Sequence, residues 1–272
     1  MHELALFAHV PDSRVAQVER ALTTVTGMTA ARMLEHHLIY KPKRNRQTTG
    51  GNANTGSGTG PANSAAGDFY YLKLVADILE GSDGLRRNSG PNGDAMEVDS
   101  GPSSVAPLAR SARSKDGPMK VDSLPYDVRR QRWTIRFSDL PEVNSKRPVT
   151  SRMIHHAAVS EGDALSFVES LGYTFLSEYI LAGHYFVSHH IYITLAKIML
   201  PHQPFTPLPV SGLQPLDPVD SYILQASIKV FSANEQETMN KGVEALKTLK
   251  NELKGIVDLE VGDRLSLDTR VR

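Results

Sequence analysis

The chain has 272 residues, and its 30 lysines and arginines are balanced by 30 aspartates and glutamates, so the formal net charge is zero. This balance gives no overall attraction to nucleic acid or to an anionic membrane, and the absence of cysteine excludes disulfides, thiolate zinc sites and a cysteine nucleophile. No apolar run approaches the ~20 residues of a membrane-spanning helix. The first residues also lack the basic region and cleavage site of a signal peptide, so a soluble intracellular protein is expected.

The N-terminal part of the chain predicts a strand, a helix and a second strand. His2–Val10 alternates well enough for a short strand. Asp12 and Ser13 are residue types that cap helices, and Gly27 is placed to end the helix that follows them. The apolar residues of this helix recur at helical spacing, at Val15, Val18, Leu22 and Val25. Residues 33–40 predict the second strand.

Two segments lack the side chains needed for a core, and we expect both to be disordered inserts in one domain that spans residues 1–272. Residues 42–67 have no aliphatic side chain larger than alanine, and residues 80–120 are rich in glycine, serine, proline and mixed charge. Neither can bury enough surface to offset an ordering entropy of ~1–2 kcal/mol per residue. Residues 68–76, between them, predict a strand. Neighbouring strands tolerate such inserts because the cost of closing a loop grows only with the logarithm of its length.

Two further strands are predicted before the middle of the chain. Residues 132–137 alternate, which predicts apolar side chains pointing inward (Trp133, Ile135, Phe137) and polar ones pointing outward (Arg132, Thr134, Arg136). Residues 148–159 predict the next strand, with Met153 and the His155–His156 pair at its centre.

The central stretch predicts a helix, a strand, a turn and a strand. Ser160 and Asp163 form a capping-box start, and Gly172 stands where a left-handed residue ends a helix. The predicted helix face consists of Leu165, Val168 and Leu171. Gly183 is expected to mark a turn, and residues 185–199 to form the returning strand.

Side-chain alternation in the first of these strands predicts two faces. One face would carry Tyr173, Phe175 and Tyr179, and the other Thr174, Leu176 and Ile180. Glu178 falls on the second face, among apolar neighbours. A buried carboxylate is costly unless it is paired or accepts hydrogen bonds. We therefore expect Glu178 to hold the strands together through an arginine or backbone N–H groups, a structural role that we favour over catalysis.

The C-terminal part predicts an extended loop over residues 202–218 and a strand over residues 222–231. A helix capped by Ser232 or Asn234 follows and ends at Gly255, and its buried side carries Met239, Val243, Leu246, Leu249 and Leu253. Residues 256–261 predict a closing strand. About eight strands with few helices indicate an α+β fold, and a sheet of this size usually closes to remove its edges.

The central stretch also carries a specific pattern, L-G-Y-x4-E-Y-x3-G-x2-F, formed by Leu171, Gly172, Tyr173, Glu178, Tyr179, Gly183 and Phe186. It resembles the signature of the Mediator subunit 18 family, which belongs to the head module of the RNA polymerase II coactivator. Weaker similarity covers Glu3, Leu4 and Leu6 and residues 37–41 and 221–261. The resemblance implies a mainly antiparallel β-barrel flanked by a few helices.

The same resemblance implies a non-enzymatic subunit that helps to link transcription factors to RNA polymerase II in the nucleus. It implies two partners, namely the related barrel of subunit 20 and a C-terminal helix of subunit 8, and contact with the polymerase machinery through the complex. No catalytic residue, cofactor or metal is expected, and no direct contact with nucleic acid or a membrane.

The histidines are the most plausible metal ligands in the sequence, at positions His36, His37, His155, His156, His184, His189 and His190. Adjacent histidines on a strand point to opposite faces, so a metal site would need one histidine from each of several strands. Without a supporting motif, ordinary wall and surface histidines are the favoured interpretation.

The alternative function is a metal-dependent triphosphate hydrolase built in a tunnel-shaped barrel. Such a site needs alternating carboxylates and a base on one strand face. The nearest match is Asp258 and Glu260, followed on that face by Gly262 in place of a base. A solvated strand face explains the two carboxylates more simply.

Two basic clusters remain, formed by Lys41, Lys43, Arg44 and Arg46 and by Arg129, Arg130, Arg132 and Arg136. Both suit a solvated surface, and the first also suits a nuclear-import patch. Nucleic-acid binding would require a broader basic surface with interleaved aromatic residues.

Overall fold

The computed structural model describes residues 1–43, 69–79, 126–143, 147–231 and 236–271. Nearly all of both predicted inserts lies outside these residues, but residue 42, the predicted start of the first insert, is still the last residue of a strand. The elements are β1 (His2–Val10), α1 (Asp12–Thr26), β2 (Ala31–Pro42), β3 (Leu72–Asp77), β4 (Thr134–Ser138), β5 (Thr150–Ala158), α3 (Ala164–Ser170), β6 (Tyr173–Ser188), β7 (Ile191–Leu200), β8 (Gln214–Pro215), β9 (Tyr222–Val230) and α4 (Gln236–Glu252).

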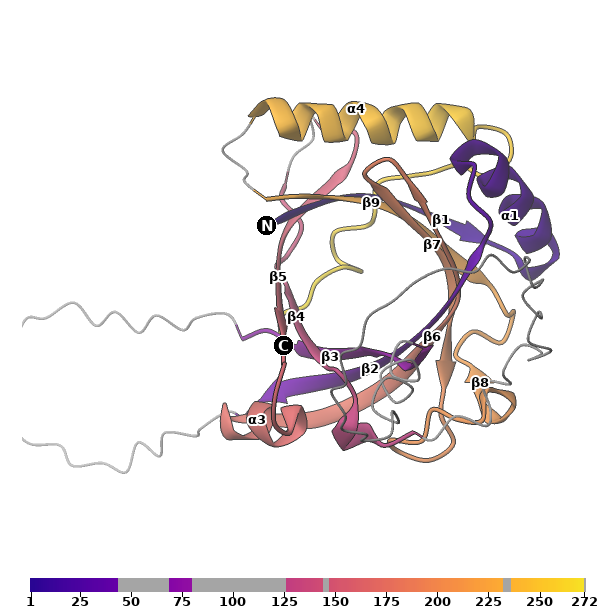
Figure 1. The fold of residues 1–272 in the computed structure, drawn as a ribbon. Helices are drawn as coiled ribbons and strands as arrows, with labels where there is room; N and C mark the ends of the chain where they lie inside the picture. Colours follow the sequence, from indigo (N-terminus) through magenta and orange to yellow (C-terminus); the bar gives the residue numbers. More distant parts are fainter. Residues whose placement is uncertain (44–68, 80–125, 144–146, 232–235, 272) are drawn as a thin grey trace, which may run out of the picture.

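Eight of these strands close into an antiparallel barrel. The order around the wall is β6-β2-β3-β4-β5-β1-β9-β7, and β7 pairs with β6 to complete the ring, while β8 is an additional short strand on β7. Figure 1 shows α4 and α1 against the outside of the wall near β1 and β9, with α3 outside β6 at the opposite end. The α+β barrel that the strand count and the family resemblance predicted is therefore confirmed.

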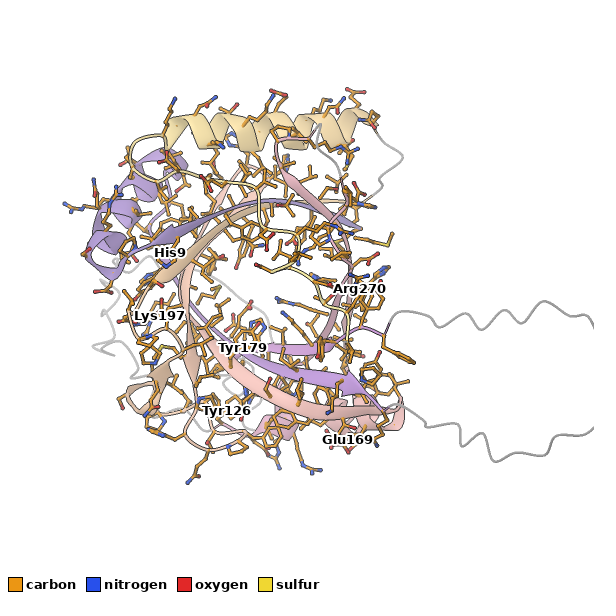
Figure 2. The ribbon with its side chains drawn as sticks, turned by 180° about the vertical axis from the view of Figure 1, so that it is seen from behind. His9, Tyr126, Glu169, Tyr179, Lys197 and Arg270 are labelled. Atoms are coloured by element: carbon orange, nitrogen blue, oxygen red, sulfur yellow. The ribbon has the colours of Figure 1, made fainter. Side chains whose placement is uncertain are left out.

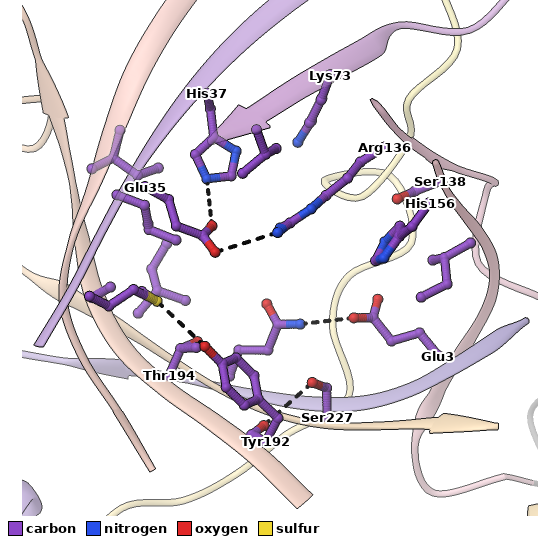
Figure 3. A pocket seen from close by; sticks show the side chains of 18 of the residues that line it. Glu3, Glu35, His37, Lys73, Arg136, Ser138, His156, Tyr192, Thr194 and Ser227 are labelled. Atoms are coloured by element: carbon purple, nitrogen blue, oxygen red, sulfur yellow. Dashed lines mark hydrogen bonds and ion pairs between the residues drawn. The ribbon is translucent and has the colours of Figure 1, made fainter. Parts of the chain in front are cut away.

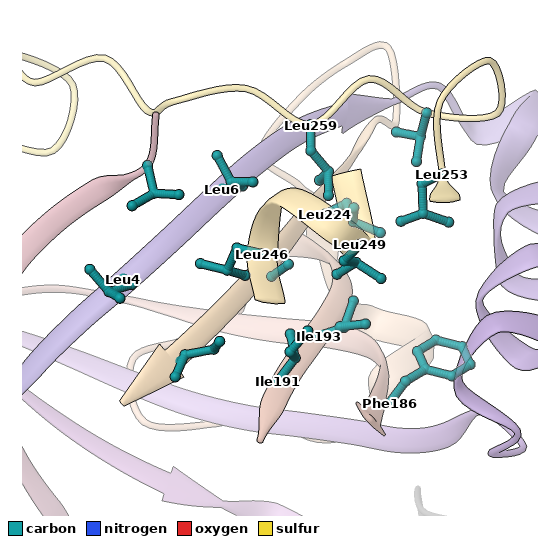
Figure 4. Packing of buried hydrophobic residues seen from close by; sticks show 14 of the residues in the cluster. Leu4, Leu6, Phe186, Ile191, Ile193, Leu224, Leu246, Leu249, Leu253 and Leu259 are labelled. Carbon is teal, nitrogen blue, oxygen red and sulfur yellow. The ribbon is translucent and has the colours of Figure 1, made fainter. Parts of the chain in front are cut away.

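The outer face of the wall is apolar where helices cover it. The largest buried cluster joins α4 and α1 to β1, β7 and β9, and Leu246 and Leu249 of α4 lie beside Leu224 (Figure 4). A second cluster lies under α3, around Leu38, Leu74, Trp133 and Val168. Within the described residues, no helix has the length and apolarity to cross a bilayer.

The predicted faces of β4 are reversed with respect to the barrel axis. Trp133, expected to point inward, is 1 % exposed and belongs to the outer cluster under α3. Arg136, expected to point to solvent, lines the cavity inside the barrel. The reason is that this barrel places its apolar core outside the wall, under helices, and keeps a polar lumen.

The residues that cap the helix N-termini differ from those predicted, whereas the glycines predicted to end the helices do lie at the helix ends. Pro11 is the N-cap of α1 and no side chain caps the helix, so Asp12 and Ser13 do not have that role. At α3 the cap is Asp163, whose carboxylate accepts from the backbone N–H groups of Leu165 and Ser166, and Ser160 lies outside the helix. Gly27, Gly172 and Gly255 all adopt the expected positive φ.

The face of α3 that packs on the wall contains Ala164 and Val168, both buried. Leu171 does not belong to it, because its side chain is 54 % exposed.

Strand β6 does not turn at Gly183. It continues to Ser188, and the hairpin turn lies at His189 and His190, where His189 has a φ of 54°. A Cβ on Gly183 would lie 2.2 Å from the Leu195 carbonyl oxygen and 2.6 Å from the Ala196 Cα atom. The glycine is therefore required by the close approach of β7, and this kind of contact can place a glycine inside a strand.

A β-bulge changes the side-chain faces of β6. The register against β2 pairs Ile39 with Ser177 but Tyr40 with Phe175, so Leu176 is an extra residue in β6. As a result Phe175 packs in the outer cluster on the same side as Ile180, whereas Tyr179 faces the lumen. The predicted grouping of Phe175 with Tyr179 was wrong for this reason.

The C-terminal helix has the predicted buried face, with Met239, Val243, Leu246, Leu249 and Leu253 all buried. Its predicted caps, Ser232 and Asn234, lie outside the described residues. The predicted closing strand at 256–261 is not one of the described strands: it makes a single bridge between Glu260 and Phe7. The chain then runs from the β1 side of the barrel to the opposite side, near β3 and β4, where Arg270 forms a bridge with Tyr70.

Candidate functional site

The signature residues occupy three separate places. Leu171 and Gly172 form the end of α3, and Tyr173 begins β6 beside the outer cluster. Gly183 and Phe186 lie where β6 meets β7, with Phe186 fully buried. Glu178 and Tyr179 are neighbours on opposite faces of the wall, and Figure 2 shows Tyr179 on the lumen side with Tyr126 on the outside.

Glu178 contacts two groups from distant parts of the chain, and one of them is held in turn by a third. One carboxylate oxygen accepts a 2.8 Å hydrogen bond from the Phe205 backbone N–H, and the other lies 2.7 Å from His36 Nε2. His36 Nδ1 lies 2.5 Å from the Tyr126 hydroxyl. The backbone partner agrees with the sequence-based hypothesis, whereas the second partner is a histidine instead of an arginine. This network connects β2, β6 and the loop after β7, which is the arrangement that a structural role requires.

His36 and His37 point to opposite faces, as adjacent strand residues must. His36 joins the Glu178 network outside the wall, and His37 lies in the lumen, stacked on Tyr179 with ring centroids 4.5 Å apart. Among the other histidines, His184 contacts Glu19, 2.5 Å away. In the described part of the chain, no group of three or more histidine and carboxylate side chains is arranged to hold a metal ion.

The lumen contains a cavity of about 270 Å³ lined mainly by polar side chains. The strand register arranges some of these residues in two rows. Within each row, residues on adjacent strands lie directly opposite one another. One row runs from Lys73 on β3 through Arg136 on β4 to His156 on β5. The other runs from Arg152 on β5 through Glu3 on β1 to Lys229 on β9.

The two carboxylates in the cavity are both paired (Figure 3). Glu35 accepts a 2.9 Å hydrogen bond from His37 Nε2 and lies 3.5 Å from Arg136. Glu3 lies 2.6 Å from Arg152 and also accepts from the Gln225 side chain. Each carboxylate is thus already neutralised by an arginine.

The lumen shifts the pKa values of its titratable groups. Burial acts to raise the pKa of Glu35, but the His37 hydrogen bond and the Arg136 charge outweigh it and lower the pKa to about 2. Burial lowers the pKa of His37 to about 4 in spite of Glu35. Burial, with Lys229 and Arg136, also lowers the pKa of His156 to about 4. Both histidines are therefore neutral at pH 7.

Sequence reasoning did not identify the lumen as a site. Its residues come from all eight strands of the barrel and are brought together only by closure of the barrel, so no local motif marks them. The sequence did contain one indication of the lumen, namely the polar residues that alternate with apolar ones in the predicted strands. These polar residues were expected to face solvent.

The carboxylates and most of the basic residues singled out from the sequence lie elsewhere. Asp258 and Glu260 are exposed and do not line the cavity. Arg129 pairs with Asp163, 3.1 Å away on the outside of the barrel, and of the second basic cluster only Arg136 lines the cavity. In the first cluster Lys41 and Lys43 are exposed, and its two arginines lie outside the described residues.

Comparison with known proteins places this fold in a family. A model of the family described as Med18 protein matches residues 2–270. The Mediator of RNA polymerase II transcription subunit 18 of Aspergillus oryzae is 30% identical over the full length of both chains, and that of Aspergillus niger is 32% identical, also over both full lengths. The Saccharomyces cerevisiae subunit 18 is 27% identical over 57% of this chain and 50% of its own.

A solved structure shares the fold. A chain in the structure of the Schizosaccharomyces pombe Mediator head module superposes with a TM-score of 0.66 at 19% identity, covering 96% of this chain and 99% of that one. Together with the full-length sequence matches, this shows that the chain belongs to the Med18 family, the family of Mediator subunit 18.

Proposed function

We propose that this chain is a non-enzymatic subunit of the Mediator head module in the nucleus, where it helps to link transcription factors to RNA polymerase II. The observation that carries the proposal is the family match over residues 2–270, which spans the barrel wall, the outer helices and the C-terminal segment together. The fold shared with a chain of the head module supports the same assignment.

The proposed partners are the barrel of subunit 20 and a C-terminal helix of subunit 8. Barrel-to-barrel contact and capture of a helix in a groove are modes in which a rigid wall provides the recognition surface. A stable complex of this kind buries ~1,200–2,000 Å² in total. The polymerase would be reached through the assembled complex.

Reconstitution tests these partners directly. The full chain is co-expressed with subunit 20 and the C-terminal segment of subunit 8, and a variant lacking residues 44–67 and 81–120 is tested in parallel. We expect both forms to elute with both partners at one volume in size-exclusion chromatography. Elution of the full chain alone would contradict the proposed partners, and loss of binding only in the deletion variant would show that the inserts contribute to the interface.

The alternative, a triphosphate hydrolase, is favoured by one observation, which is the basic lumen of a closed barrel. Against it, Glu3 and Glu35 come from different strands and each is engaged by an arginine. Incubation with nucleoside triphosphate and manganese tests this alternative. We expect phosphate release no faster with the protein than with buffer, and release that depends on Glu3 and Glu35 would support the enzyme.

A further inference from the structure

The charges in the lumen do not balance. The cavity is lined by two more cations than carboxylates: Lys73, Arg136, Arg152 and Lys229 against Glu3 and Glu35. His37 and His156 add no charge at pH 7, because the pKa of each is lowered to about 4. The lining of the lumen therefore carries an excess of positive charge, in a chain whose formal net charge is zero.

Two of these cations are neighbours on adjacent strands and lie on the same face of the wall. Lys73 is the direct cross-strand partner of Arg136, and both side chains point into the cavity. Side chains in such pairs have Cβ atoms only ~4.5–5.5 Å apart, and like charges directly opposite one another are destabilising. An anion between the two would turn this repulsion into two attractive contacts.

Lys73 and Lys229 both lack an ion-pair partner among the described residues of the lumen, and Lys73 is the less exposed of the two. Among the described residues it makes no ion pair or hydrogen bond, and its one close polar contact is with the face of the Tyr179 ring, 5.9 Å from the ammonium nitrogen to the centroid. Burial, with Arg152 and Arg136, lowers its pKa. Nearby, Arg136 Nε and His37 Nδ1 are buried without a hydrogen-bond partner.

We propose that the lumen binds a small phosphate-class oxyanion, inorganic phosphate or pyrophosphate, between Lys73 and Arg136. The guanidinium offers directed N–H donors, including Nε, and the ammonium adds a compact point charge, which is the pairing that suits phosphate oxygens. His156 and Arg152 lie on the neighbouring strand, on the same side of the wall. The volume of about 270 Å³ is just below the ~300–1,000 Å³ of sites for larger ligands, which favours the free anion over a whole nucleotide.

Thermal unfolding and titration calorimetry of the full chain test the site, with phosphate, pyrophosphate and ATP as separate probes and chloride at matched ionic strength as the reference. We expect phosphate and pyrophosphate to raise the melting temperature in a saturable manner and ATP to bind more weakly than pyrophosphate. Lys73→Met is expected to weaken pyrophosphate binding at least about tenfold, equivalent to ~1.4 kcal/mol. Lys254→Met, which removes an exposed lysine outside the barrel, should bind as the unmodified chain does.

A second variant keeps the test decisive if Lys73→Met folds poorly. Ser138 lines the cavity two residues after Arg136 on the same face of β4. Ser138→Glu supplies a carboxylate inside the lumen, so we expect it to raise the melting temperature of the free chain and to abolish the response to pyrophosphate. The proposal is overturned if chloride stabilises the chain as much as phosphate does. It is also overturned if Lys73→Met or Ser138→Glu binds pyrophosphate as tightly as the unmodified chain.

Discussion

His37 and His156 make the stability of the barrel sensitive to acid. In the unfolded chain each takes up a proton near pH 6.5, whereas in the folded protein the pKa of each is about 4. Their contribution to stability is therefore complete above pH 6.5 and is lost as the pH falls toward 4. The pKa of Glu35 is lowered from 4.5 to about 2, so Glu35 adds a further loss of stability as the pH falls below 4.5.

We expect the free energy of unfolding, measured by urea denaturation, to fall steadily between pH 6.5 and pH 4. His37 contributes up to ~1.4 kcal/mol per pH unit of this slope. His37→Gln keeps a donor near the position of Nε2 for Glu35 and removes the titration, so it should reduce the slope. Ser227→Ala, a lumen change without a titratable group, should leave the slope as it is, and an unchanged slope in His37→Gln would refute this assignment.

Glu178 provides a second prediction at this scale. Its two oxygens accept from the Phe205 N–H and from His36, so Glu178→Gln places an amide N–H₂ against one of these donors. A hydrogen bond to a charged group contributes ~1.5–3 kcal/mol, and we expect a loss of this order in chemical denaturation. Glu169→Gln, an exposed change on α3, serves as the control. If both variants were equally stable and assembled equally well, Glu178 would not hold the strands together.

The sequence identified Glu178 as an unusual acid because a single strand pattern places it among apolar residues. It could not identify the network, since His36 is 142 residues away and meets Glu178 only when β2 and β6 pair, while Tyr126 joins the network through His36. The lumen pairs Glu35–Arg136 and Glu3–Arg152 were missed for the same reason.

At the scale of the elements, Gly183 allows the close packing of β6 on β7. Because a Cβ there would lie 2.2 Å from a backbone oxygen of β7, Gly183→Ala must push the two strands apart. We expect a destabilisation of more than ~3 kcal/mol, or failure to fold, by circular dichroism and denaturation. Gly212→Ala is the matched control, since the nearest atom to its added Cβ is 3.8 Å away. Equal stability of the two variants would show that β6 and β7 do not pair as described.

The positions of β1, β5 and β9 were predictable from the local sequence, but two features of β6 were not. A glycine at a turn and a glycine under a crowded neighbour look alike in a sequence, so the turn was placed at Gly183 instead of at His189 and His190. The bulge at Leu176 is a property of the pairing with β2 and reverses the face assignment on one side of it.

At the scale of the whole molecule, the number of strands and the family pattern were enough to predict a closed antiparallel barrel. They could not predict which face of the wall is apolar. Alternation shows only that the two faces differ, and the covering helices α1, α3 and α4 decide that the apolar face points outward. This arrangement leaves a charged interior and places the core beneath the outer helices.

The central claim is that this barrel works as a component of a larger assembly. Affinity purification of the tagged full chain from nuclear extract, followed by mass spectrometry, tests that claim most directly, with Gly183→Ala as the variant in which β6 and β7 cannot pair normally. The account predicts that subunits of Mediator, subunit 20 and subunit 8 among them, copurify with the unmodified chain and are depleted with the variant. Recovery of the unmodified chain as a monomer that hydrolyses triphosphates would contradict it.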